Sequence, residues 1–150
     1  MRDDKDNLLQ HYRETRAGLL AAIEGLSDEQ LSEPSVDGWS VKDHLLHIAL
    51  WDDIRANEVV RISAGHDSAW RISGKHDSAY NDMAHEQRLR MSPAQARWEL
   101  ETSRQRLLDA IAAATPRGLD GSRYGEAGLR SQHEVQHAGW ITRWRTEKGI

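Results

Sequence analysis

The sequence of 150 residues contains no cysteine and no phenylalanine. The absence of cysteine excludes disulfides, a thiolate nucleophile and thiolate metal ligands. No run of about 18 apolar residues occurs, and the opening MRDDKDNLLQ lacks the apolar core of a signal peptide. We therefore expect neither a membrane span nor secretion, and the cytoplasm is the expected location. The formal net charge is −4, with arginines scattered among acids, so nucleic acid is not an expected partner.

Charged residues and tryptophan are well represented in the chain. It is 29% charged and 38% hydrophobic, as in a soluble globular protein, and its length suits one domain over residues 1–150. There are six tryptophans. Large rings fill helical cores well, so we expect four of them to be buried. These four are Trp51, Trp98, Trp140 and Trp144.

Hydrophobic periodicity predicts four main helices and no strand. The expected ranges are about 3–26, 41–62, 93–114 and 129–147. Ser40 is a suitable N-cap for the second helix, and Ser92 with Pro93 at the first helical position starts the third. Four helices with a long connection between the second and the third predict an all-α four-helix bundle.

A ten-residue sequence occurs twice in tandem between the second and third helices. RISAGHDSAW at 61–70 is followed directly by RISGKHDSAY at 71–80, and seven of ten positions are identical. Two copies are too few for a solenoid, so we interpret them as a duplication that lengthens a loop. Gly65 and Gly74 are expected to mark turns, and a short helix is expected over about 78–90.

The two HDSA copies allow two interpretations. In one, the loop is a lid beside a metal site, and Asp67 or Asp77 accepts a proton. In the other, which is favoured because Asp and Ser are common helix caps, His66 and His76 open two N-terminal capping segments. His85, in the expected short helix, is predicted to be exposed.

Two histidines in the last helix are spaced for metal binding. In QHEVQHAGWITRW, His133 and His137 are four residues apart, which places both rings on one face of a helix together with Trp140. Imidazoles placed in this way can converge on one ion. The spacing alone is a weak signal, because a sequence with eight histidines produces such pairs by chance. Two ordinary helix histidines are therefore the alternative.

The second helix offers a third ligand. In WSVKDHLLHIALWD, His47 lies among apolar residues, where a neutral imidazole needs partners for both nitrogens. Metal ligation with a hydrogen bond to the second nitrogen meets that need. Three histidine ligands leave one coordination position open, which is typical of catalytic sites. The residues expected around a substrate pocket are His44, Trp51, Tyr80 and Trp140, with Asn81 as a further candidate.

These segments resemble the DinB-like superfamily of metal-binding four-helix bundles. The resemblance rests on GWSVKDHLLHIALWD and the late HxxxHxG helix, and it implies that His47, His133 and His137 are the metal ligands. The stretch AYNDMAHEQ also resembles the branch that includes colibactin self-resistance proteins. The chain departs from the family at one point. The family often has Arg-Gly-Gln after the final ligand, where this chain has Ala-Gly-Trp at 138–140.

The resemblance implies a divalent-metal enzyme that acts on small reactive molecules, as a hydrolase or a thiol-dependent transferase. All-imidazole ligation suits Zn or Ni, and a low-molecular-weight thiol is the expected cosubstrate of a transferase. No general base is identified by the sequence. The alternative function is a non-catalytic protein that binds and sequesters a small toxic compound on the same bundle. The resemblance also makes a homodimer an expected assembly.

Overall fold

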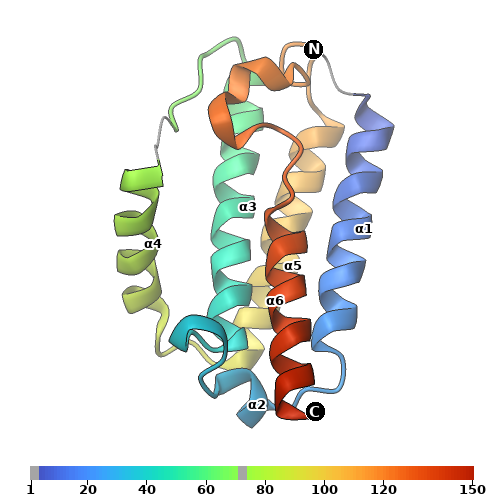
Figure 1. Ribbon diagram of the computed structural model, residues 1–150. Helices are drawn as coiled ribbons and strands as arrows, with labels where there is room; N and C mark the ends of the chain where they lie inside the picture. The colour runs from blue at the N-terminus through green and yellow to red at the C-terminus, as the bar shows by residue number, and fades with distance from the viewer. Residues whose placement is uncertain (1–3, 71–73) are drawn as a thin grey trace.

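The computed structural model describes residues 4–70 and 74–150. Its named elements are all helical (Figure 1). The α-helices are α1 (Lys5–Ile23), α2 (Asp28–Ser32), α3 (Val41–Ser63), α4 (Gly74–Arg88), α5 (Pro93–Ala112) and α6 (His133–Lys148), and the 3₁₀ segments are η1 (Val36–Gly38) and η2 (Gly121–Ala127). Within the described ranges, no helix has the length and apolar character that a membrane span requires.

Four of these helices form the bundle. Figure 1 shows α1, α3, α5 and α6 roughly aligned, while α4 lies apart beside α3. Helix α3 packs most extensively against α5, and α1 packs against both α6 and α5. The predicted all-α four-helix bundle with a long connection between its second and third helices is therefore confirmed, and α4 lies within that connection.

The second and third helices of the bundle begin where their sequences predict. Ser40 caps α3, because its Oγ accepts a hydrogen bond from the Asp43 backbone N–H at 3.1 Å. In return, the Asp43 carboxylate accepts from the Ser40 N–H at 3.0 Å, which completes a capping box. Ser92 caps α5 in the same way, and Pro93 occupies the first helical position.

The last helix begins later than predicted, at His133 instead of near residue 129. The Ser131 Oγ accepts a hydrogen bond from the His133 N–H at 3.1 Å and so satisfies a free donor at the helix start. Leu129 is buried, and its carbonyl accepts a hydrogen bond from the Tyr12 hydroxyl. The residues before His133 are thus held to α1 instead of continuing the helix.

Two apolar clusters fill the interior of the bundle. One lies toward the C-terminal ends of α3 and α5, and its members include Leu8, Tyr12, Val59, Ile62, Leu107 and Ile111. The other lies toward the N-terminal ends of the same two helices, and it includes Leu19, Ile23, Leu45, Ile48, Leu100, Ile141 and Trp144. Both clusters are built from apolar stripes of amphipathic helices.

A layer of buried charges separates the two clusters. Arg104 on α5 donates to both carboxylate oxygens of Asp52 on α3, at 2.9 and 3.2 Å, and to Glu134 on α6 at 2.6 Å. Arg16 on α1 donates to the same carboxylates, to Asp52 at 3.0 Å and to Glu134 at 2.6 Å. We call these four residues the ionic layer. It joins all four helices of the bundle.

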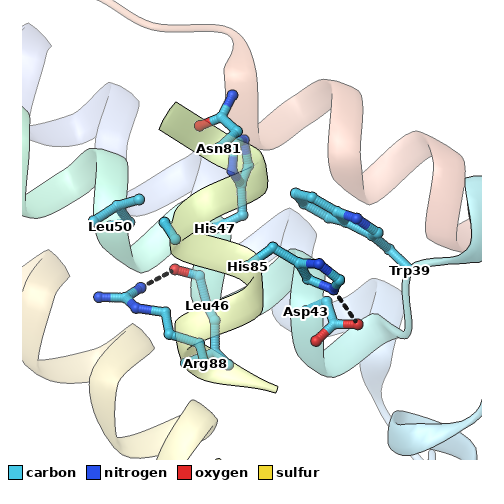
Figure 2. A pocket seen from close by; sticks show the side chains of 9 residues that line it. Trp39, Asp43, Leu46, His47, Leu50, Asn81, His85 and Arg88 are labelled. Atoms are coloured by element: carbon cyan, nitrogen blue, oxygen red, sulfur yellow. Dashed lines mark hydrogen bonds and ion pairs between the residues drawn. The ribbon is translucent and has the colours of Figure 1, made fainter. Parts of the chain in front are cut away.

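Helix α4 is attached to α3 through polar side chains on one of its faces (Figure 2). His85 stacks on Trp39, with ring centroids 4.6 Å apart, and its Nε2 lies 3.2 Å from an Asp43 carboxylate oxygen. One turn further on, Arg88 donates to the Leu46 carbonyl at 2.8 Å. The prediction that His85 is exposed is therefore wrong, because its contact with the Asp43 carboxylate and its stacking on Trp39 hold it against the start of α3.

The two copies of the duplicated sequence differ in structure. In the first copy, α3 ends at Ser63, Gly65 has a φ of +97° at a turn, and residues 66–70 form no regular element. In the second, residues 71–73 and the side chain of His76 lie outside the described part, and α4 begins at Gly74. Gly65 thus marks a turn as predicted, whereas the predicted turn at Gly74 is wrong.

The capping interpretation of the second HDSA copy is also wrong, because that copy lies inside α4. Asp67 of the first copy pairs with Arg117 at 3.3 Å on the surface. The same residues thus form a loop in one place and a helix in another, since local propensity is a weak preference that surrounding contacts override.

The expectation of burial is confirmed for Trp144 but wrong for Trp98 and Trp140, whose side chains are 61% and 37% exposed, and Trp51 is only half-buried. The buried face of α5 contains Ala96, Leu100, Arg104 and Leu107, which are spaced by three or four residues. Trp98 is two residues from Ala96 and from Leu100, which places it on the opposite side of the helix. Its hydrophobic character alone did not indicate the direction in which it points.

We expect Arg104→Met to lower the free energy of unfolding by about 3–5 kcal/mol, because it leaves two buried carboxylates short of a partner. The matched control is Arg106→Met on the same helix, where the exposed ion pair with Asp53 contributes less than about 1 kcal/mol. Urea denaturation followed by circular dichroism measures both. Equally small losses in the two variants would show that the ionic layer does not hold the bundle.

Candidate metal centre

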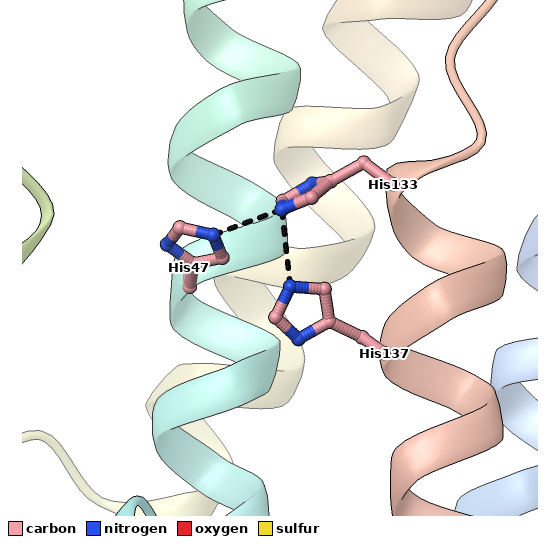
Figure 3. Close-up of side chains that lie close together, drawn as sticks. All are labelled: His47, His133 and His137. Atoms are coloured by element: carbon pink, nitrogen blue, oxygen red, sulfur yellow. Dashed lines mark hydrogen bonds between the residues drawn. The ribbon is translucent and has the colours of Figure 1, made fainter. Parts of the chain in front are cut away.

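Three histidines from two helices point toward one another (Figure 3). His47 belongs to α3, and His133 and His137 lie one turn apart at the start of α6. The Nε2 of His133 is 2.9 Å from the Nε2 of His47 and 3.0 Å from the Nε2 of His137. One ligand atom from each ring lies within 4.8 Å of the other two. The structure thus brings together the three histidines that the sequence singled out.

The arrangement of these nitrogens fits a metal ion. Two nitrogens bound to a tetrahedral ion at about 2.0–2.1 Å are about 3.3 Å apart, close to the separations in the cluster. Hydrogen bonds alone do not satisfy the three rings, because each imidazole nitrogen carries either one proton or one lone pair. The Nε2 of His133 faces two other Nε2 atoms, so it cannot form a good hydrogen bond to both. One ion would accept all three lone pairs.

Burial keeps the cluster uncharged near neutral pH. Burial, with the neighbouring His133 as a lesser cause, lowers the pKa of His47 to about 3. The pKa of His133 falls to about 4 through burial and the charge of Arg55. That of His137 falls to about 2 through burial and the proximity of His133. Neutral imidazoles have the free lone pair that metal ligation requires.

His44 supports the cluster from behind. It is buried, and its Nδ1 lies 2.8 Å from the Nδ1 of His137. If His137 offers Nε2 to an ion, its proton lies on Nδ1 and is donated to His44. Burial lowers the pKa of His44, which favours the neutral ring that can accept this hydrogen bond, although the Val36 carbonyl acts to raise that pKa. His44 therefore lies in the cavity wall, as expected, and is also placed to hydrogen-bond to His137.

A cavity of about 340 Å³ lies beside the histidines. Such a volume can hold a small organic molecule. The four histidines on its wall are His44, His47, His133 and His137, and its other lining residues are Val36, Asp37, Trp39, Ser78, Asn81, Asp82 and Trp140. The wall combines side chains from the η1 turn and from α3, α4 and α6. Helix α4 therefore helps to form the cavity although it lies outside the four-helix bundle.

Of the residues expected around the pocket, Trp51 and Tyr80 lie outside the described cavity wall, whereas the others line it. Trp140 lines the cavity, with its ring centroid 4.8 Å from that of His137. Trp51 and Tyr80 are not among the described lining residues, and they pack with Trp70 in an aromatic cluster. The Trp51 indole donates to the Asn81 side-chain oxygen at 3.0 Å. This cluster therefore holds Asn81 in the cavity wall.

The η1 turn contributes residues that the sequence analysis did not single out. Asp37 has a φ of +56° and Gly38 one of +81°, so the chain reverses tightly before the cap of α3. This turn positions the Trp39 ring 5.4 Å from the His47 ring and places Asp37 in the cavity wall. The Asp-Gly dipeptide directly before the capping residue Ser40 was the available signal for such a turn.

Comparison with known proteins identifies the family. The family model of the DinB superfamily matches residues 11–141. The chain belongs to the DinB superfamily. A crystal structure of an uncharacterised protein from Escherichia coli UTI89 is similar, with a TM-score of 0.81 and 16% identity over 97% of this chain and 95% of that one. At this identity the likeness concerns the fold alone. No curated protein matches the chain.

The resemblance to the DinB superfamily is thus confirmed, while the likeness to the colibactin self-resistance branch stays a prediction. The departure after the last histidine has a structural consequence in this DinB protein. Where the family often has a polar side chain, Trp140 presents an indole to the cavity wall. A molecule bound at this point therefore meets an aromatic ring with a single N–H donor in place of that polar side chain.

Proposed function

We propose that this DinB protein is a divalent-metal-dependent enzyme that acts on a small electrophilic molecule, by hydrolysis or by transfer of a thiol to it. The observation that carries the proposal is the convergence of three Nε2 atoms in the wall of a cavity of about 340 Å³. Structural ions are typically enclosed by four protein ligands, whereas catalytic ions keep a position open. Three ligands beside a cavity fit the second arrangement.

The proposed ligands are His47, His133 and His137, each through Nε2, and this donor set suits Zn or Ni. When bound, the ion acts as a Lewis acid and lowers the pKa of a water molecule or a thiol, so that a nucleophile is present near neutral pH. His44 fixes the orientation of the His137 ring by accepting a hydrogen bond from its Nδ1.

The other cavity residues are assigned to recognition and proton transfer. Trp39 and Trp140 provide apolar walls for a small organic substrate. Asp37 and Asp82 are the carboxylates among the described lining residues, and we assign the role of proton acceptor to Asp37. Its turn is held by a 2.8 Å hydrogen bond from the Ser35 N–H to the Trp39 carbonyl, which fixes the carboxylate beside the histidines.

The thiol in a transfer reaction has to come from outside the chain, which has no cysteine. A low-molecular-weight thiol fits this role, because a cavity of about 340 Å³ admits only small molecules. A solvent-connected cavity beside the histidines favours the enzyme over the alternative function, a protein that only sequesters a toxic compound.

The metal site is tested by elemental mass spectrometry on untagged protein purified without chelator. We expect about one equivalent of divalent metal per chain in the wild type and little in His137→Ala, because two ligands hold an ion poorly. His66→Ala is the control, since His66 is an exposed loop residue. Wild-type protein that stays metal-free after reconstitution with Zn or Ni would rule out the proposal.

The supporting role of His44 makes a separate prediction. His44→Phe keeps a ring at this position but removes the acceptor for the His137 Nδ1–H, so we expect metal affinity to fall about 10–100-fold. Competition with a chromophoric chelator measures the affinity, and His66→Phe serves as the control. An unchanged affinity in His44→Phe would mean that His137 is oriented by packing alone.

Catalysis is tested on metal-loaded protein with two probe reactions, cleavage of an activated ester and transfer of cysteine or glutathione to an aryl halide. We expect saturable turnover in at least one, which Asp37→Asn lowers by about 10²-fold or more without loss of metal. Asp53→Asn, at a surface ion pair, is the control. Stoichiometric metal with no turnover of either probe would favour the sequestering function over the enzyme.

A further inference from the structure

A second cavity lies further along α3, toward its C-terminal end. His47, Trp51 and Arg55 follow one another at intervals of four residues, so they share one face of the helix. Arg55 and Trp51 line the second cavity together with Glu58, Trp70 and residues of the η2 region. Its volume is about 20 Å³, which is enough for one water molecule or one ion of similar size.

Two hydrogen-bond donors in the wall of this cavity have no partner among the described residues. Arg55 is only 9% exposed, and its guanidinium makes neither a hydrogen bond nor an ion pair with any residue in the described ranges. The indole Nε1 of Trp70 is buried and also has no acceptor within those ranges. A largely buried cation without a counter-charge is strongly disfavoured, and the described lining residues offer Arg55 no acceptor.

The carboxylate in the same wall does not supply that acceptor. Both oxygens of Glu58 are already used, because one accepts from Arg61 and from the Ala69 N–H, and the other accepts from the Ser68 hydroxyl. The hydroxyl of Tyr124 donates to the Gly118 carbonyl. The described lining residues therefore present unused donors and no unused carboxylate.

The charges of the interior lead to the same conclusion. In the ionic layer, two arginines are balanced by two carboxylates. Glu58 is balanced by Arg61. Arg55 is then a buried positive charge without compensation in the described part of the protein, and its field is strong enough to lower the pKa of His133. A water molecule in the cavity would satisfy a donor but would leave the charge uncompensated.

We propose that this cavity binds a small monovalent anion, held by the Arg55 guanidinium and the Trp70 indole N–H. The occupant is either a free halide or the carboxylate group of a small organic acid, since both are compact, singly charged acceptors. Phosphate and sulfate are too large for a cavity of about 20 Å³. The site is distinct from the metal centre, because no histidine of that centre is among its described lining residues.

The test is thermal unfolding of the metal-loaded protein at equal ionic strength in sodium chloride, bromide, acetate and gluconate. Gluconate serves as the reference anion, because the hydroxylated carbon next to its carboxylate is too bulky for a cavity that admits acetate at most. We expect the midpoint temperature to rise saturably, by about 3 °C or more, with at least one small anion. Stabilisation by the halides identifies a free ion, and stabilisation by acetate alone identifies a carboxylate. Equal midpoints in all four salts would overturn the proposal.

Variants separate this site from other effects of salt. Arg55→Met should lose the anion effect and be at least as stable as the wild type in gluconate, because it removes an uncompensated charge. Arg143→Met, at an exposed position on α6, should keep the effect. Metal-free His137→Ala should also keep it, so that binding of the anion to the metal is excluded and the result does not depend on the proposed function.

A crystal soaked in bromide gives a direct answer even if Arg55→Met fails to fold. An anomalous peak beside Arg55 is expected, and a water molecule there would overturn the proposal.

Discussion

The ionic layer formed by Arg16, Asp52, Arg104 and Glu134 determines how the four helices stand relative to one another. Buried charges tolerate little displacement, because a shift of one helix turn would leave a carboxylate or a guanidinium without its partner in an apolar interior. Glu134 is the neighbour of His133, and Asp52 lies on α3 just beyond His47. The separation of the histidine rings is therefore fixed largely by α1 and α5, which contribute none of the three histidines.

The electrostatics of the interior bear on the chemistry proposed for the histidine cluster. Three neutral imidazoles contribute no negative charge, so the charge of a divalent ion held by them would remain uncompensated by its ligands. Arg55, on the same face of α3 as His47, adds a further positive charge. An environment of this kind stabilises anions, and therefore the deprotonated form of a water molecule or a thiol.

The sequence predicted the helices well because the signals for them are local. Capping boxes at Ser40 and Ser92 depend on residues within one turn, and the four-residue spacing of His133 and His137 fixes their relation on a single helix. The ionic layer and the η1 turn were not predicted. The role of each depends on contacts between segments that are distant in the sequence. For the ionic layer, a signal was present, because Arg104 is a charged residue within the otherwise apolar stripe of α5. Trp98 was wrongly predicted to be buried because its hydrophobicity was considered without asking which face of α5 it occupies.

The duplicated decapeptide has an implication for how the length of this connection can change in evolution. One copy extends from the end of α3 into an irregular segment and the other begins α4, yet the contacts that hold α4 come mostly from residues after the repeat, such as His85 and Arg88. The connection can thus gain ten residues at once while the helices that carry the histidines keep their places. Such a segment can acquire length, and with it new chemistry at the cavity rim, by replication slippage alone.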